Sequence, residues 1–158
     1  ERKESTARWY GQANLSFSRV RHAGLDGVLR PGSFDYPVVA NVVGGYRLSP
    51  RWDVSTRLAF LSGRPFTPFD IAQSMAQRRA VNDLTRVNAG RAPDYFRADL
   101  RVDRRFIVAG REVSVFAGVQ NLTNRRNVAG YTWDRRQNTI RVNDQLGVFP
   151  ILGLDWNF

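Results

Sequence analysis

The chain has 158 residues and a formal net charge of +10, and it lacks cysteine, which excludes disulfides and thiolate metal sites. A single histidine, His22, excludes a histidine metal cluster and argues against a Ser-His-Asp triad. No apolar run is long enough for a membrane-spanning helix, and the charged start "ERKESTARWY" lacks the apolar core of a signal peptide. The protein is therefore either cytoplasmic or the C-terminal part of a longer chain.

Six segments alternate apolar and polar residues, the pattern of β-strands with two unlike faces. They span residues 9–18, 36–47, 52–61, 95–106, 112–121 and 146–158. Tight turns at "LSPR" and "VAGR" alternate with longer connections, among them residues 63–93 and 123–145. All tight turns then lie at one end of the predicted sheet and all long loops at the other. This asymmetry is typical of bacterial outer-membrane barrels.

Large aromatic residues gather at the two ends of the apolar face. Near the turn end are Trp9, Tyr46, Trp52, Phe106, Trp156 and Phe158, and near the loop end are Phe17, Phe60 and Phe96. Mainly Ala, Val, Leu and Gly lie between them. Two aromatic rows that flank an aliphatic band match the interfacial girdles of a membrane barrel. A soluble sandwich would bury its aromatics centrally.

The opposite face is polar and carries a ladder of charges that would line a barrel lumen. The ladder comprises Asp53, Arg57, Arg97, Asp99, Arg101, Asp103 and Arg105. In a soluble protein the same residues would form a solvated face. A catalytic pair of Asp99 and Asp103 would be about 13 Å apart along a strand, whereas glycosidase pairs need about 5 to 9.5 Å. We therefore expect no enzyme and no cofactor, and we expect the ladder to pair with neighbouring strands or an enclosed domain.

Three residues stand out against this pattern. Arg104 lies on the apolar face near the turn end, where its side chain can snorkel to the headgroups. Pro150 lacks a ladder donor, which predicts a bulge or an unpaired position. Asn121 begins an "NLT" sequon, which we interpret as the end of a strand, with Asn121 and Asn124 turning the chain.

The stretch "FDYPVVANVVGGYRLSPRWDVSTRLAFLSGRPFTP" resembles a passage of TonB-dependent outer-membrane receptors, with the pattern D-x-P, Y-x-L, W and S-G-x-P-x-T-P. "YFRADLRVDRRF", "VSVFAGVQNLTNRRNV" and the last-strand sequence "PILGLDWNF" extend the resemblance over residues 36–158. It implies a barrel of roughly 22 strands with an N-terminal plug. Such receptors import bulky nutrients, of siderophore, cobalamin, glycan or peptide type, with inner-membrane energy.

Six strands are too few to close a membrane barrel, which needs about eight. We therefore expect an all-β, antiparallel up-and-down meander in which residues 1–158 are the C-terminal portion of a larger transmembrane barrel. The plug, its energy-coupling box and earlier strands would precede it in the same protein. The location is then the bacterial outer membrane. The expected partners are outer-membrane lipid, the missing strands and plug, the TonB system through that plug, the barrel assembly machinery and an unidentified small molecule, but no nucleic acid.

The resemblance also implies that the long loops help to enclose a ligand. The candidate ligand-binding residues are Arg64, Phe66, Phe69, Arg78, Arg79, Tyr131, Trp133, Arg135 and Arg136. Thr67 and Asp70 fit a capping box for a short helix that ends at Met75 or Gln77. The alternative is that these loops only connect strands and bind no ligand.

The last strand is similar to an outer-membrane assembly signal through Gly153, Trp156 and Phe158, although Ile151 stands where a polar residue is usual. On this ground we expect residue 158 to be a true C-terminus and residue 1 an artificial beginning. Two alternatives remain. One is a different outer-membrane porin or adhesin barrel. The other is a soluble basic β-barrel that binds single-stranded nucleic acid, which requires aromatic and arginine side chains interleaved on one face.

Overall fold

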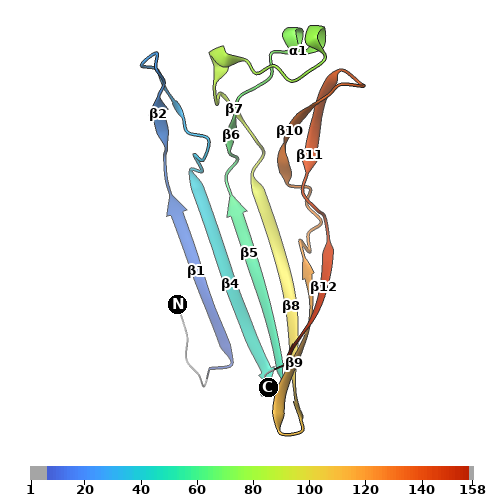
Figure 1. Cartoon of the computed structure of the whole chain (residues 1–158). Coiled ribbons are helices and arrows are strands. Elements are labelled where there is room, and N and C mark those ends of the chain that lie inside the picture. Colours follow the sequence, from blue (N-terminus) through green and yellow to red (C-terminus); the bar gives the residue numbers. More distant parts are fainter. Residues whose placement is uncertain (1–6, 157–158) are drawn as a thin grey trace.

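Six long strands form one antiparallel sheet in the computed structural model, which describes residues 7–156 (Figure 1). The strands, in both chain order and sheet order, are β1 (Trp9–Phe17), β4 (Val38–Ser49), β5 (Trp52–Leu61), β8 (Tyr95–Val108), β9 (Arg111–Gln120) and β12 (Phe149–Trp156). The prediction of an all-β antiparallel meander is confirmed. β1 and β12 are the two edge strands, so the sheet is open.

The two tight turns lie at one end of the sheet and the long connections at the other (Figure 1). We call these the turn end and the loop end. The β4–β5 turn is at Pro50 and Arg51, and the β8–β9 turn uses Ala109 and Gly110, both with positive φ. Glycine adopts such a backbone at no steric cost, which explains the sharp reversal at "VAGR".

The long connections contain structure of their own. The first holds a hairpin of β2 (Arg21–Ala23) and β3 (Leu29–Pro31), and the last holds β10 (Val128–Asp134) and β11 (Thr139–Asp144). The middle connection pairs β6 (Pro65–Phe66) with β7 (Gly90–Arg91) and carries the helix α1 (Ile71–Gln77) and the 3-10 turn η1 (Leu84–Arg86). Sequence reasoning treated all three as loops.

Cross-strand register places the apolar residues on one face of the sheet. Ala13, Val42, Leu58 and Ala98 lie directly opposite one another across β1, β4, β5 and β8. A second row, toward β12, contains Val54, Val102, Ala117 and Leu152. Side chains of directly paired residues point to the same side of a sheet, so all these rows lie on one surface. We call this surface the apolar face and the opposite surface the polar face.

The aromatic residues predicted to form the girdle all lie on the apolar face, apart from Phe158, which is outside the described residues. Trp9, Tyr46, Trp52, Phe106 and Trp156 are toward the turn end, and Phe17, Phe60 and Phe96 toward the loop end. Phe17 is 74% exposed and Trp156 is 52% exposed.

Within residues 7–156, neither face of the sheet is covered by another layer. The elements with extensive mutual contact are all neighbouring strands. Apart from Pro65, the buried aliphatic and aromatic side chains of residues 7–156 are those of Ala98 and Trp133. Within that range, no helix has the length and apolar character needed to cross a membrane. The described part of the chain therefore has almost no hydrophobic core of its own, although domains normally bury the apolar face of a sheet against a second layer.

Two glycines on the polar face lie under aromatic rings from the neighbouring strand. Tyr10 is directly opposite Gly45, and Phe116 is directly opposite Gly153. A Cβ added at either glycine would meet the ring. An aromatic ring that folds over a cross-strand glycine protects the bare backbone and helps to fix the strand register.

Two local predictions can be compared with the structure. Asn121 and Asn124 both have positive φ and end β9, so the predicted turn is confirmed. Pro150 was expected to lie at a bulge or an unpaired position, and this prediction is wrong, because Pro150 pairs with Val119 in a continuous register. An edge strand bonds a neighbour on one side only, so alternate residues need no ladder donor.

Candidate functional site

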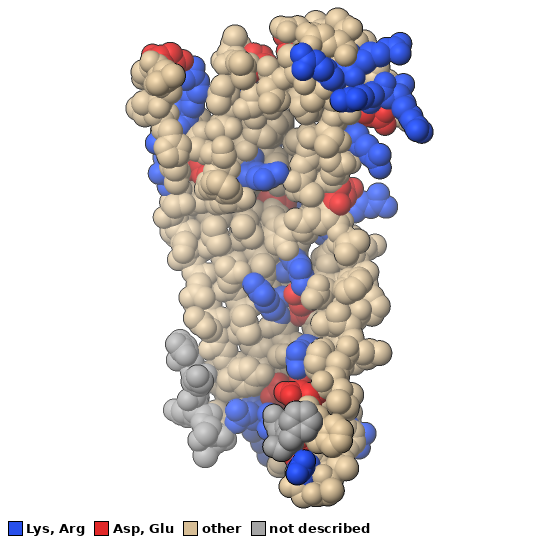
Figure 2. Space-filling model, viewed as in Figure 1, with Lys and Arg blue, Asp and Glu red and all other residues tan. Residues whose placement is uncertain are grey.

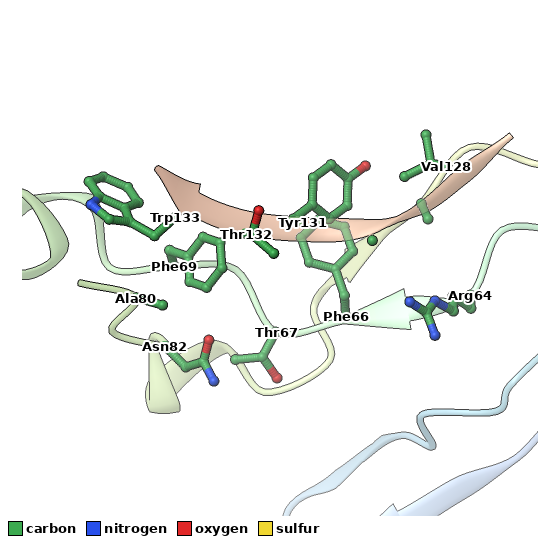
Figure 3. Close-up of a pocket in the computed structure, with 12 residues that line it drawn as sticks. Arg64, Phe66, Thr67, Phe69, Ala80, Asn82, Val128, Tyr131, Thr132 and Trp133 are labelled. Carbon is green, nitrogen blue, oxygen red and sulfur yellow. The ribbon is translucent and has the colours of Figure 1, made fainter. Parts of the chain in front are cut away.

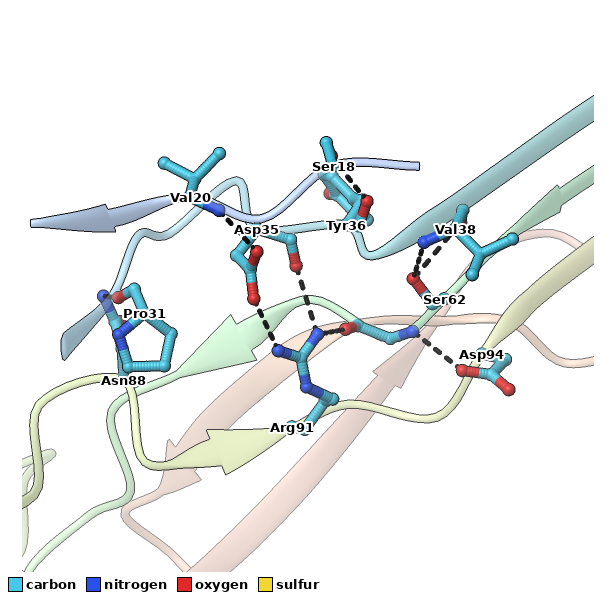
Figure 4. A network of polar contacts seen from close by, with 11 residues as sticks. Ser18, Val20, Pro31, Asp35, Tyr36, Val38, Ser62, Asn88, Arg91 and Asp94 are labelled. Atoms are coloured by element: carbon cyan, nitrogen blue, oxygen red, sulfur yellow. Dashed lines mark hydrogen bonds and ion pairs between the residues drawn. The ribbon is translucent and has the colours of Figure 1, made fainter. Parts of the chain in front are cut away.

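An ion pair between the buried Asp35 and the exposed Arg91 joins the first and the middle long connections at the loop end of the sheet (Figure 4). Asp35 is 4% exposed and accepts from the backbone N–H of Val20 at 2.8 Å and from Nη2 of Arg91 at 2.7 Å. Nη1 of Arg91 donates to the carbonyl oxygens of Asp35 at 3.1 Å and Gly63 at 2.5 Å. We call Asp35, Arg91 and Gly63 the collar.

The carboxyl of Asp35 is stabilised in its ionised form. The N–H of Val20 and then the guanidinium of Arg91 lower the pKa of Asp35 below its ordinary value. The collar therefore depends on a negative charge at Asp35.

Gly63 is required where β5 leaves the sheet. A Cβ at this position would collide with the backbone carbonyl oxygen of Ala92, which cannot move aside without shifting the chain. The N–H of Gly63 donates to Oδ1 of Asp94 at 2.8 Å. The neighbouring Ser62 exchanges hydrogen bonds with the backbone of Val38. Asp35, Ser62 and Gly63 belong to the "FDYP" and "LSGRPFTP" sequences, so these sequences meet in one place.

The segment between Pro68 and Asp83 closes on itself. Phe69 forms a β-bridge with Asn82, and Ser74, which is fully buried, exchanges hydrogen bonds with the backbone of Val81. Asp70 is the N-cap of α1 and accepts from the N–H of Gln73 at 2.9 Å. The helix ends at Gln77, one of the two predicted ends.

The capping role expected of Thr67 is wrong. Its hydroxyl oxygen accepts from the N–H of Asn88 at 3.0 Å, because α1 starts only at Ile71. Asn88 in turn donates to the carbonyl of Pro31 at 2.8 Å. Thr67 therefore fastens the middle connection to itself and, through Asn88, to the first connection.

The β10–β11 hairpin packs on this middle connection. Nη2 of Arg64 donates to the carbonyl oxygen of Ala129 at 2.6 Å, and Nδ2 of Asn138 donates to that of Met75 at 3.1 Å. At the base of the hairpin, Asn127 is buried and pairs with both backbone groups of Phe96, at 3.0 and 2.8 Å. The asparagine side chain thus replaces one rung of a β-ladder.

A cavity of about 450 Å³ lies between the hairpin and the middle connection (Figure 3). The Phe66 and Tyr131 rings have centroids 4.5 Å apart, and Phe69 and Trp133 make an edge-on contact at 6.2 Å. Phe66 also lies over Gly90, its cross-strand partner. Trp133 is fixed by a hydrogen bond from its indole N–H to Oδ1 of Asn138 at 3.3 Å. We call this cavity the aromatic pocket.

Five of the predicted ligand-binding residues line the aromatic pocket and four do not. The five are Arg64, Phe66, Phe69, Tyr131 and Trp133. Arg78 and Arg79 follow α1, and Arg135 and Arg136 lie between β10 and β11, all four exposed. In Figure 2 basic side chains gather over this part of the loop end.

Sequence reasoning missed several pocket residues, among them Thr67, Asn82, Val128 and Thr132. A signal for two of them was present. Val128 and Thr132 lie in "VAGYTWD", which alternates like a strand and precedes a turn-rich "RRQN" and the apolar Ile140 and Val142. The hairpin could therefore have been predicted, whereas the approach of Asn82 depends on the tertiary fold.

The charge ladder on the polar face pairs mainly within its own strand. Arg97 contacts Asp99 at 2.6 Å, and Arg101 contacts Asp103 at 2.6 Å, each pair two residues apart on β8. Successive same-face residues on a strand are close enough for a bidentate arginine to reach back, so cross-strand partners are not needed. Figure 2 shows acidic and basic groups together in the middle of the sheet.

Three further ladder residues lie beside these pairs. Asp53 is directly opposite Asp103, and Arg57 is directly opposite Asp99. Arg105 lies 3.8 Å from Glu112 of β9. Arg101 also stacks on Phe116, 3.7 Å from the ring centroid, but its charge is already matched by Asp103.

The described residues contain no group of acidic or histidine side chains suited to a metal ion. Nor do they contain a buried side-chain polar atom that lacks a hydrogen-bond partner. The aromatic pocket offers a ligand aromatic rings for stacking, the guanidinium of Arg64 and the side-chain amide of Asn82. Such a pocket suits binding.

Compared with models of known protein families, with curated proteins and with solved structures, the chain shows no match.

Proposed function

We propose that this chain is part of the wall of a transmembrane β-barrel in the bacterial outer membrane, in a TonB-dependent receptor that imports a bulky nutrient. The observation that carries the proposal is the uncovered apolar face, a single surface bounded by aromatic side chains and lacking a second layer. A sheet of this kind is stable where hydrocarbon replaces the second layer.

The open edges of β1 and β12 support the same proposal. Unpaired backbone groups are not tolerated in the hydrocarbon region, so further strands must complete the wall. The polar face then borders the lumen, where its paired charges stay solvated or meet an enclosed plug. The TonB-dependent type rests on the resemblance described above, which includes the "FDYP" and "LSGRPFTP" sequences, and these two sequences meet at the collar.

In this proposal the aromatic pocket contributes to ligand binding at the outer surface. It combines two aromatic pairs with Arg64 at the end of the sheet that carries the long connections. The nutrient is of siderophore, cobalamin, glycan or peptide type. The role of the wall itself is passive: it holds the loops in place and separates lipid from lumen.

Expression of the complete reading frame that encodes this chain, followed by fractionation of the cell envelope, tests the proposal. The protein should appear in the outer-membrane fraction, require detergent for extraction and migrate differently on gels before and after heating. A monomer that is soluble in plain buffer would contradict the proposal and would favour the nucleic-acid-binding alternative.

The role of the pocket needs its own test. A strain that lacks the gene should be complemented with the complete protein and grown on each nutrient class in turn. Replacing Phe66 and Tyr131 by alanine should abolish growth on the nutrient that the wild type imports. Replacing Arg135 and Arg136, which lie outside the pocket, is the matched control. Equal growth of both variants would remove the pocket from the proposal.

A further inference from the structure

Arg104 is a cation on the face of the sheet that is otherwise apolar. Over the six long strands this face carries no Asp or Glu, and its other charged residue, Arg111, lies farther out beside the β8–β9 turn. Arg104 itself is exposed and near the turn end. Its charge is therefore not matched by an acidic side chain on the same surface.

Two aromatic rings hold the Arg104 side chain. Trp52 is directly opposite Arg104 on β5, and Phe106 follows two residues later on β8. The guanidinium carbon lies 4.9 Å from the Trp52 ring centroid and 4.7 Å from that of Phe106. Stacking on ring faces restrains a guanidinium while its in-plane N–H groups stay available for an anion.

We infer that Arg104, held by Trp52 and Phe106, binds the phosphate of an anionic phospholipid in the membrane leaflet nearest the tight turns. The inference rests on the proposed membrane location. Arginine matches two phosphate oxygens with parallel hydrogen bonds. Val102 and Val115, the same-face neighbours of Arg104, offer the acyl chains an aliphatic surface.

Other arginines of β8 show why Arg104 differs. Arg101 also stacks on an aromatic ring, but it lies on the polar face and its Nη2 contacts Asp103 at 2.6 Å. Arg105 is on the polar face as well, 3.8 Å from Glu112. Arg104 combines ring stacking with an unmatched charge and an apolar surround, which are the features of a lipid headgroup site rather than of a lumen pair.

Native mass spectrometry of the complete protein in detergent tests this inference, with phosphatidylglycerol and phosphatidylcholine of identical acyl chains as probes. The wild type should retain phosphatidylglycerol preferentially. Arg104→Gln should weaken that retention about fivefold, the effect of one charge near a lipid surface. Arg104→Lys should lose part of it, and Arg105→Gln, the neighbouring control on the polar face, should retain it fully.

Three results would overturn the inference. One is equal retention of phosphatidylglycerol by Arg104→Gln and Arg105→Gln, provided that both variants keep heat-modifiable migration. That result would remove the lipid site but would not contradict the proposed membrane location. Another is complete displacement of the lipid by inorganic phosphate, which would indicate a free-anion site. The third is a wild-type protein that is soluble without detergent, which contradicts the proposed function as well.

Discussion

The hydroxyl of Tyr10 on β1 donates to Oδ1 of Asp53 on β5 at 2.7 Å, although strand β4 lies between them. The contact is possible because Gly45 of β4, directly opposite Tyr10, has no side chain to block the ring. Three strands are thereby tied on the polar face by one side chain.

Gly45→Ala should therefore destabilise the protein by about 1 to 3 kcal/mol, the usual cost of overpacking, because the new Cβ meets the Tyr10 ring. Gly44→Ala is the matched control, since its Cβ would find Tyr10 O at 3.8 Å and nothing closer. Urea unfolding of the complete protein in detergent measures both. Equal stability of the two variants would show that the Tyr10 ring moves aside without cost.

Val42 and Val43 provide a matched test of the two faces. They are adjacent on β4 and are 41% and 42% exposed, but Val42 lies on the apolar face and Val43 lies opposite Arg57 on the polar face. Val42→Glu should cost about 1 to 3 kcal/mol, because lipid cannot solvate the carboxyl group. Val43→Glu should be nearly neutral. Envelope levels and urea unfolding give the comparison, and two neutral variants would argue against lipid on this face.

The collar should weaken in acid. Hydrogen bonds lower the pKa of Asp35 in the folded protein, so its ionised form stabilises the collar. This stabilisation is fully present at pH values above the pKa of Asp in the unfolded chain, which is about 3.9. That stabilisation is lost as the pH falls through the folded pKa. Pepsin cleavage within residues 18–37, normalised to cleavage of an unfolded substrate at the same pH, should therefore increase more at low pH in the wild type than in Asp35→Asn.

Asp26→Asn is the control for this acid effect. Asp26 pairs with Arg30 at the exposed end of the β2–β3 hairpin, away from the collar. The variant should keep the acid-dependent cleavage of the wild type. Loss of that dependence in Asp26→Asn would locate the titration in the hairpin instead.

Asn127→Ala should detach the β10–β11 hairpin. It would leave the N–H and carbonyl of Phe96 without their partners, at a cost of about 1 to 3 kcal/mol. Asn143→Ala, which removes one hydrogen bond to the Thr132 hydroxyl, should cost less than about 1 kcal/mol. Limited proteolysis of residues 128–144 measures the difference, and similar protection of both variants would contradict it.

Much of the sheet could be predicted from the sequence, because side-chain alternation is a local property of each strand. The segments around Trp9, Trp52 and Phe106 were all placed correctly and on one face. The β2–β3 hairpin was missed because its alternation is short and interrupted by turn residues such as Gly27. The β10–β11 hairpin was missed although "VAGYTWD" alternates like a strand.

The candidate site was predicted only in part. Phe66 and Tyr131 were chosen as aromatic residues of two separate loops, and their stacking required both loops to fold toward each other. Arg135 and Arg136 were also chosen for their residue type and their place in a long loop. They lie in the turn between β10 and β11 and do not line the pocket.

The sequence by itself determined the strands, the two unlike faces and the ends at which turns and loops lie, since each follows from period-two patterning and turn residues along the chain. The tertiary structure decided which distant groups meet: Tyr10 with Asp53 over Gly45, Asp35 with Arg91, and Arg104 with Trp52. Those contacts depend on cross-strand register and on loop packing, which join residues that the local pattern does not relate.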